Sequence, residues 1–231
     1  AMGNALPAIP DLPALHTATN DVFRLANAVD RRAACRWRAV HTLAEVRVLH
    51  ESRGFAPRQQ LGQNFLLDPN LIRKLVDASG VGAGDLVLEI GPGTGALTDE
   101  LLARGCVVIA CELDAGLAEL QRERQAQAID AGRFTLIEGD CLAGKRELNE
   151  SVRSAIGERA FALVANLPYG AATPAMLALL CDERCSGQFV TIQREVADRL
   201  LAGPGSKAYG SISVVAQTLA HVDRIATLPP E

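Results

Sequence analysis

The 231-residue sequence lacks several features that mark common classes of protein. No apolar run reaches the roughly 20 residues that cross a membrane, and the N-terminal residues do not have the pattern of a secretory signal. Aromatic residues make up only 4% of the chain, and the formal net charge is −4. Because nucleic-acid-binding proteins usually offer a basic face and stacking rings, both values argue at first against that class.

The six cysteines form no CxxC pair. Cys106 and Cys111 lie in an apolar, strand-like stretch and are predicted to pack in the core. Cys181 and Cys185 would share one face of a helix, but a metal site there needs two more ligands and no histidine lies within 30 residues. The sequence therefore predicts free thiols, no bound metal, and a reducing compartment, the cytoplasm.

The composition is that of a globular protein, with 48% hydrophobic and 22% charged residues. Its charge is unevenly distributed. Residues 1–58 hold eight arginines and no lysine against five acidic residues, a charge of +3, so the remainder carries −7. The sequence predicts an N-terminal extension over residues 1–57 that is helical. One helix would begin at Thr19 or Asn20 and contain Phe23, and a second would run from Trp37 to Leu49.

The arginine-rich faces of these helices could contact phosphates, but a solvated helix face is slightly favoured. After residue 80, apolar strand patterns alternate with helical ones. The expected strands are residues 86–90, 107–112, 134–138, 161–166 and 188–193, and the expected helices are residues 95–103, 114–128, 174–181 and 194–201. This alternation predicts an α/β fold with a doubly wound, mostly parallel sheet. Ligands of such sheets bind beyond the carboxyl ends of the strands.

A glycine-rich turn, residues 89–95, follows the first of these strands. Gly91 and Gly93 would let the backbone approach a ligand closely. The spacing is GxGxG, which is neither the dinucleotide fingerprint nor a phosphate-binding P-loop. Glu112 ends the next strand and could accept both ribose hydroxyls of an adenosine-like ligand, whereas Asp114 is the better helix cap. This pair alone does not separate NAD from S-adenosylmethionine.

Two later strand ends also carry polar groups. Asp140 could accept a hydrogen bond from an adenine amine or form a local Asx-turn, and its spacing favours neither. Residues 166–169, Asn-Leu-Pro-Tyr, combine an amide carbonyl, a rigid turn and an aromatic ring. These groups suit an amine-bearing flat base, as in enzymes that act on flipped bases. A strand-end turn with a packing tyrosine accounts for the four residues equally well.

Taken in order, five motifs resemble the S-adenosylmethionine-dependent rRNA adenine N6-dimethyltransferases of the KsgA and Erm types. They are residues 60–66, residues 89–95, residues 112–114, Asp140 and residues 166–169. Residues 193–200 and 202–210 resemble the KsgA branch, which dimethylates two adjacent adenines in small-subunit rRNA. The resemblance covers residues 58–231 and implies a Rossmann-like class I methyltransferase domain.

The resemblance also implies a role for individual residues. Those expected to bind the cofactor, S-adenosylmethionine, are Gln63, Asn64, Leu66, Gly91, Gly93, Glu112, Leu113, Asp140, Cys141 and Asn166. Those expected to act on the target adenine are Asn166, Leu167, Pro168 and Tyr169, with the two residues after Asn166 offering backbone carbonyls. The expected partner is small-subunit rRNA in the pre-ribosomal small subunit, and the expected state is a monomer without metal or membrane attachment.

The sequence departs from the family pattern in three places. Residues 170–172, Gly-Ala-Ala, lack a hydroxyl that the family commonly has. Residues 1–57 have no family counterpart, and the chain stops at Glu231, before an expected interior strand and a helical rRNA-binding domain. We therefore expect either that the native gene is longer or that the chain was truncated or cleaved. The alternatives are a catalytically weak or inactive methyltransferase-like rRNA-binding assembly factor, an Erm-like enzyme of large-subunit rRNA, and, least favoured, an NAD-dependent enzyme.

Overall fold

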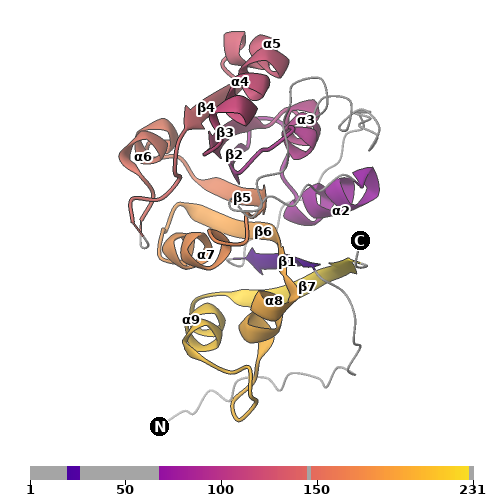
Figure 1. Cartoon of the computed structure of the whole chain (residues 1–231), viewed down its shortest axis with the longest axis vertical. Coiled ribbons are helices and arrows are strands. Elements are labelled where there is room, and N and C mark those ends of the chain that lie inside the picture. Colours follow the sequence, from indigo (N-terminus) through magenta and orange to yellow (C-terminus); the bar gives the residue numbers. More distant parts are fainter. Residues whose placement is uncertain (1–19, 27–67, 145–146, 229–231) are drawn as a thin grey trace.

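The computed structural model describes residues 20–26, 68–144 and 147–228, which form one seven-stranded sheet flanked by helices (Figure 1). The strands are β1 (Asn20–Ala26), β2 (Leu86–Ile90), β3 (Val107–Glu112), β4 (Phe134–Glu138), β5 (Phe161–Asn166), β6 (Cys185–Gln193) and β7 (His221–Leu228). The helices are α2 (Pro69–Ser79), α3 (Ala96–Ala103), α4 (Ala115–Arg124), α5 (Ala126–Asp130), α6 (Glu150–Ile156), α7 (Ala172–Leu180), α8 (Arg194–Leu201) and α9 (Ser211–Leu219).

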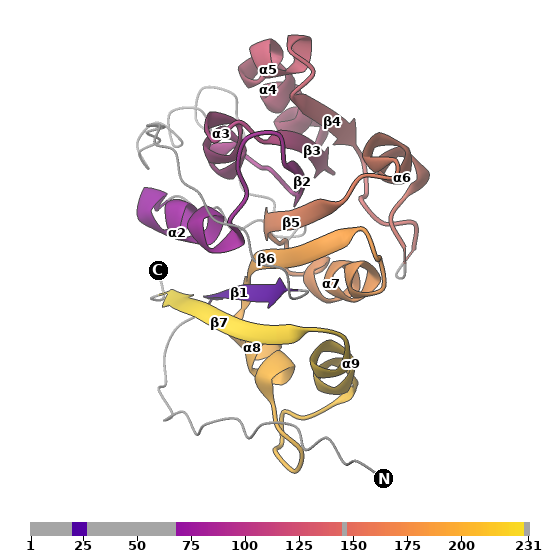
Figure 2. The same cartoon turned by 180° about the vertical axis from the view of Figure 1, so that it is seen from behind.

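The strand order is β4-β3-β2-β5-β6-β1-β7, and the five strands from β4 to β6 pair in parallel. Helices cover both faces of the sheet, as Figures 1 and 2 show from opposite sides. One hydrophobic cluster joins the sheet to α6, α7, α8 and α9, and a second joins it to α2, α3 and α5. The predicted doubly wound, mostly parallel sheet is confirmed.

Side chains along each strand alternate between these two clusters. Leu86, Leu88 and Ile90 pack toward α6–α9, whereas Val87 packs toward α2 and α3. Because successive strand residues point to opposite faces, Glu89 lies on the α2 and α3 side. The same alternation puts Glu112 on that side, since Val108 and Ala110 belong to the second cluster. It therefore gathers the polar strand ends on one face.

The helix predicted from Thr19 or Asn20 is wrong for residues 20–26, which form strand β1. All seven residues pair antiparallel with β6 on one side and with β7 on the other, with a register shift between Val22 and Phe23 on the β7 side. Phe23 is fully buried in the core cluster. The short apolar run suits either structure locally, and pairing on both sides decides for the strand. This part of the extension belongs to the sheet, in an interior position that the resemblance assigned to residues after Glu231.

Other boundaries differ from prediction by small amounts. Helix α3 begins at Ala96, one residue later than expected, and the helix expected over residues 114–128 is divided at Gln125 into α4 and α5. Asp114 caps α4 as predicted, because its side chain accepts hydrogen bonds from the first-turn backbone. Cys181 is exposed after α7 and Cys185 is buried at the start of β6, so the two do not share a helix face.

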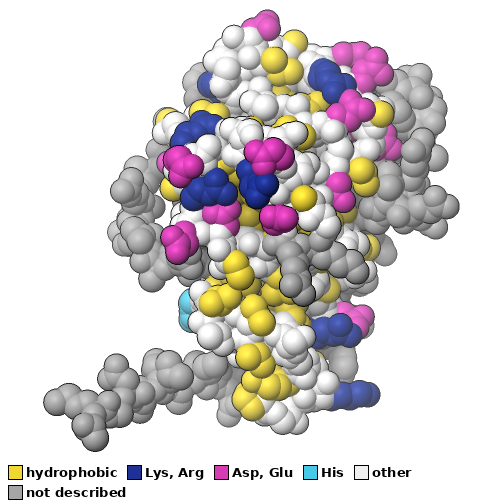
Figure 3. Space-filling view, turned by 90° about the vertical axis from the view of Figure 1, so that its left-hand side faces the viewer, with side chains coloured by type: hydrophobic (Ala, Val, Ile, Leu, Met, Phe, Trp, Pro, Cys, Tyr) yellow, Lys and Arg dark blue, Asp and Glu magenta, His cyan; other side chains and the backbone are white. Residues whose placement is uncertain are grey.

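The surface on the side of the molecule that lies to the left in Figure 1 is divided by side-chain type. Figure 3 shows oppositely charged side chains interspersed in its upper half and hydrophobic ones gathered in its lower half. Val214, Val215 and Leu219 of α9 are among the exposed large hydrophobic residues. In the described part of the chain, no helix is long and apolar enough to cross a membrane. The second helix predicted in the extension, from Trp37 to Leu49, lies outside the described residues.

Candidate functional site

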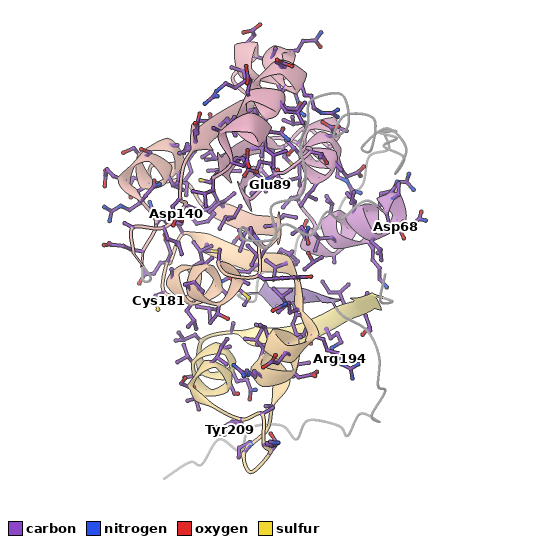
Figure 4. The ribbon with its side chains drawn as sticks, viewed as in Figure 1. Asp68, Glu89, Asp140, Cys181, Arg194 and Tyr209 are labelled. Carbon is purple, nitrogen blue, oxygen red and sulfur yellow. The ribbon has the colours of Figure 1, made fainter. Side chains whose placement is uncertain are left out.

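The carboxyl ends of three neighbouring strands carry polar residues, and two of them, Glu112 and Asn166, were singled out from the sequence. Glu89 is next to last in β2, Glu112 ends β3 and Asn166 ends β5. These strands are adjacent in the order β3-β2-β5, and the alternation places all three side chains on the α2 and α3 side. Figure 4 labels Glu89 within this region and Asp140 on the segment after β4.

The glycine-rich turn after β2 contacts the turn after β5. Gly91 has a φ of +73°, and a Cβ added there would lie 3.0 Å from Cγ of Pro168. Only glycine adopts this conformation readily and leaves room for the proline ring. Two motifs separated by more than 70 residues therefore meet at one point of the sheet edge.

Glu112 is held by the backbone of both flanking turns. Its Oε2 accepts a hydrogen bond from the Gly93 amide at 3.0 Å, and its Oε1 accepts one from the Asp114 amide at 3.0 Å. Burial raises the pKa of Glu112 above its ordinary value, while these two backbone donors lower it. A carboxylate has about four lone-pair sites, so acceptor capacity remains for a ligand hydroxyl. Because Asp114 caps α4, the Glu112 carboxylate is not needed as a helix cap and can accept ligand hydroxyls.

A residue that the sequence did not single out supports the same turn. Gln121 of α4 is fully buried, and its Nε2 donates a hydrogen bond to the Gly93 carbonyl at 2.8 Å. A Cβ on Gly95 would lie 2.7 Å from this nitrogen, so the glycine makes room for the amide. The sequence signal for this role is a glutamine on an otherwise apolar helix face, and it does not identify the hydrogen-bond partner.

Among the acidic residues at the described strand ends, Glu89 has the most strongly shifted pKa. It is 1% exposed, and Oγ1 of Thr98 donates a hydrogen bond to its Oε2 at 2.7 Å. Burial raises the pKa of Glu89 to about 8, and the nearby charges of Asp99 and Glu112 act in the same direction. The Glu89 carboxyl group is therefore mostly protonated at neutral pH.

The segment after β4 carries two of the residues predicted to bind the cofactor, Asp140 and Cys141. Asp140 is exposed, and its Oδ1 accepts a hydrogen bond from the Leu142 amide at 2.9 Å, which is the Asx-turn considered from the sequence. Cys141 is buried in the core beside Cys111, and their hydrogen bond raises the pKa of the Cys141 thiol. The Cys141 side chain therefore packs in the core, so its predicted contact with a cofactor would have to come from its backbone. Leu113 directly follows the carboxyl end of β3 and is 58% exposed.

The turn of residues 166–169 is fixed by β6 and by the start of α7. Thr191 donates its hydroxyl hydrogen to Oδ1 of Asn166, and the Leu167 amide donates to the Thr191 carbonyl at 3.2 Å. The Pro168 carbonyl accepts hydrogen bonds from the amides of Ala171 and Ala172 at 3.0 and 3.1 Å. Both lone pairs of the Pro168 carbonyl are therefore engaged within the turn. Of the two backbone carbonyls expected to meet the target amine, we retain only that of Leu167.

The same contacts show how the turn is held although residues 170–172 lack the hydroxyl that is common in the family. Ala172 is 2% exposed and begins α7 within the core cluster, so the turn is closed by backbone bonds without a hydroxyl there. Tyr169 is half-buried beside the turn. Gln63, Asn64 and Leu66 lie outside the described residues, and their predicted contacts stay predictions. Within residues 20–26, 68–144 and 147–228, no group of three metal-ligating side chains is present.

The sheet order and the two contacting turns define a Rossmann-like methyltransferase domain. Residues 54–231 match the model of the ribosomal RNA adenine dimethylase family, and the chain belongs to this family. Strand β1 lies outside the matched residues.

Known proteins show the same relationship. "Ribosomal RNA small subunit methyltransferase A" of Leifsonia xyli subsp. xyli is 45% identical over 179 residues, covering 75% of this chain and 60% of that protein. The protein of that name from Mycobacterium bovis (strain BCG / Pasteur 1173P2) is 44% identical over 190 residues, covering 80% and 57%. A dimethyladenosine transferase structure from Plasmodium falciparum matches with a TM-score of 0.53 and 26% identity, over 66% of this chain and 51% of that one. The chain thus spans about 60% of the length of the two curated relatives.

Proposed function

We propose that the chain transfers methyl groups from S-adenosylmethionine to N6 of adenines in small-subunit rRNA, forming dimethyladenine during ribosome assembly in the cytoplasm. The observation that carries this proposal is the contact between Gly91 and Pro168, which brings the glycine-rich turn against the Asn-Leu-Pro-Tyr turn. Relatives at 44–45% identity are named as small-subunit rRNA methyltransferases, which favours the small over the large subunit.

The residues present fit the methyl donor. Glu112 is a buried carboxylate at a strand end, held by two backbone amides and suited to accept ribose hydroxyls. Leu113 offers an exposed side chain beside it, and Asp140 offers an exposed carboxylate after the next strand. When bound, S-adenosylmethionine supplies a methyl group activated by a positively charged sulfur, so the chemistry needs neither a metal nor a covalent enzyme intermediate.

The end of β5 supplies groups for the target amine. Adenine N6 is a weak nucleophile because its lone pair is delocalised into the ring. Oδ1 of Asn166 and the Leu167 carbonyl can accept its two N–H groups, which favours a pyramidal nitrogen with a localised lone pair. Tyr169 offers a ring for the flat face of the base. These contacts act by positioning and by stabilising the positive charge that develops on nitrogen.

The experiment is transfer of labelled methyl groups from S-adenosylmethionine to small ribosomal subunits that lack the modification. Asn166→Ala should abolish transfer while S-adenosylhomocysteine still binds, because Asn166 is one of several expected cofactor contacts and Glu112 and the glycine-rich turn are unchanged. Asn70→Ala, at an exposed position on α2, is the matched control and should be fully active. A wild-type chain that binds the ligand but transfers no label would instead support an rRNA-binding assembly factor.

A further inference from the structure

Thr191 of β6 contacts the proposed amine-binding turn in two ways. It is the register partner of Asn166 in the parallel β5–β6 pair, and it is 2% exposed. Its hydroxyl donates to Oδ1 of Asn166, and its backbone carbonyl accepts the Leu167 amide at 3.2 Å. One buried residue therefore holds both the side chain of the first turn residue and the backbone of the second.

Thr191 is a polar side chain in an apolar strand. Its neighbours Val190 and Ile192 pack in one core cluster, and Phe189 packs in the other, on the face that Thr191 shares. Burying a hydroxyl is unfavourable unless it makes a hydrogen bond, and here the bond goes to Asn166. A threonine side chain is also stiff at χ1, so the hydroxyl oxygen keeps a fixed position.

The strand that carries Thr191 is itself fixed from its other side. Val22 of β1 is the register partner of Thr191, and antiparallel pairing runs along the whole of β1. Strand β6 therefore lies between two paired neighbours and cannot shift in register without breaking both ladders. A donor on such a strand can determine the orientation of an amide at the sheet edge.

We propose that Thr191 is a positioning residue for methyl transfer: its hydroxyl sets the side-chain carbonyl of Asn166 in the orientation that receives the target amine. This inference rests on the proposed function. An amide oxygen has two lone pairs, so the Thr191 hydroxyl and a substrate N–H group can both donate to Oδ1. Without the hydroxyl, the side-chain oxygen of Asn166 loses the hydrogen bond that it accepts from Thr191.

The second methylation should depend on Thr191 more than the first. In each transfer, a bond forms between N6 and the methyl carbon, the carbon–sulfur bond breaks with its electrons going to sulfur, and the nitrogen loses one proton to water. Unmodified adenine has two N–H groups that can be held by two carbonyls. The monomethylated base has one, so a badly oriented acceptor is no longer compensated by the other.

The test compares variants of the full chain on small ribosomal subunits that lack the modification. Thr191→Val removes the hydroxyl at nearly constant shape, and Thr191→Ser retains it; the backbone carbonyl is unchanged in both. Thr191→Val should lower kcat by about tenfold, the scale of one lost hydrogen bond, with S-adenosylhomocysteine affinity unchanged. Its product should shift toward monomethyladenine, whereas Thr191→Ser should give dimethyladenine at near the wild-type rate. Thr135→Val, at an exposed position on β4, is the matched control.

Each outcome decides between explanations. Thr191→Val with the wild-type rate and product ratio would overturn the inference and leave the proposed function intact. Equal impairment of Thr191→Ser and Thr191→Val would also overturn it, because packing and not the hydroxyl would then matter. If Thr191→Val does not fold, Thr191→Ala is measured by the same product ratio. A wild-type chain that binds S-adenosylhomocysteine and transfers nothing would refute the proposed function itself.

Discussion

Replacing Phe23 by alanine tests whether the N-terminal strand is part of the folded domain. Phe23 is fully buried in the larger core cluster, and the Arg224 guanidinium lies 5.8 Å from its ring centroid. Truncation of a buried phenylalanine costs about 3–5 kcal/mol, and loss of a cation–π contact at a partly exposed site adds about 0.5–1 kcal/mol. We expect Phe23→Ala to lower the free energy of unfolding by roughly 4 kcal/mol.

The assay is urea unfolding followed by far-ultraviolet circular dichroism. For a chain of this size, roughly 4 kcal/mol corresponds to a fall in Tm of about 8–16 °C. Phe23→Leu retains most of the buried volume and should cost less than about 1.5 kcal/mol. A loss below about 1 kcal/mol for Phe23→Ala would refute the packing of β1 between β6 and β7, since an unpacked extension contributes nothing to the core.

Two further predictions concern the glycine-rich turn and its buried acid. Gly95→Ala should lower S-adenosylhomocysteine affinity by at least about tenfold, because its Cβ would displace the Gln121 amide from the Gly93 carbonyl. In a calorimetric titration, Gly84→Ala, with a similar φ of +83° and no atom within 4 Å, should keep the wild-type affinity, and equal losses would contradict the argument. Burial raises the pKa of Glu89 from 4.5 to about 8, so the folded state retains a proton that the unfolded chain releases. This stabilisation is complete below pH 4.5 and is lost as the pH rises to about 8. Glu89→Gln should therefore flatten the decline in unfolding free energy between pH 5.5 and 8, and an unchanged slope would contradict the assignment.

The sequence predicts the central strands closely. The bounds of β2, β3, β4 and β5 agree with the expected ranges, because a strand buried on both faces is a short apolar run that ends at a turn. Helices α2, α6 and α9 and strand β7 were not predicted. Their patterns are short or mixed, and packing against the rest of the chain stabilises them more than local preference does.

Strand β1 shows where local patterns fail. The apolar residues around Phe23 fit a helical face, yet the partners of β1 are β6 and β7, which lie more than 150 residues later in the chain. The local sequence does not indicate that β1 lies inside the sheet between two such distant strands. Its structure is therefore a consequence of long-range pairing, which overrides helical periodicity.

Site residues that belong to a sequence motif could be predicted. Site residues that matter because of what lies opposite them in the fold could not. The turns at Gly91 and Pro168 were both named from the sequence, although their contact was not. Thr191 and Gln121 matter only because particular partners lie opposite them, at Asn166 and Gly93. A polar residue inside an apolar element is a usable signal of this kind, but it does not identify its partner.

The central claim is that the turn at the end of β5 presents an adenine amine for methylation. The most direct test is mass spectrometry of nucleosides from small-subunit rRNA after incubation with this chain and S-adenosylmethionine. We expect N6,N6-dimethyladenosine with the wild-type chain and none with Asn166→Ala, while both still bind S-adenosylhomocysteine. Dimethyladenosine formed equally well by Asn166→Ala, or none formed by a wild-type chain that binds the ligand, would contradict the account.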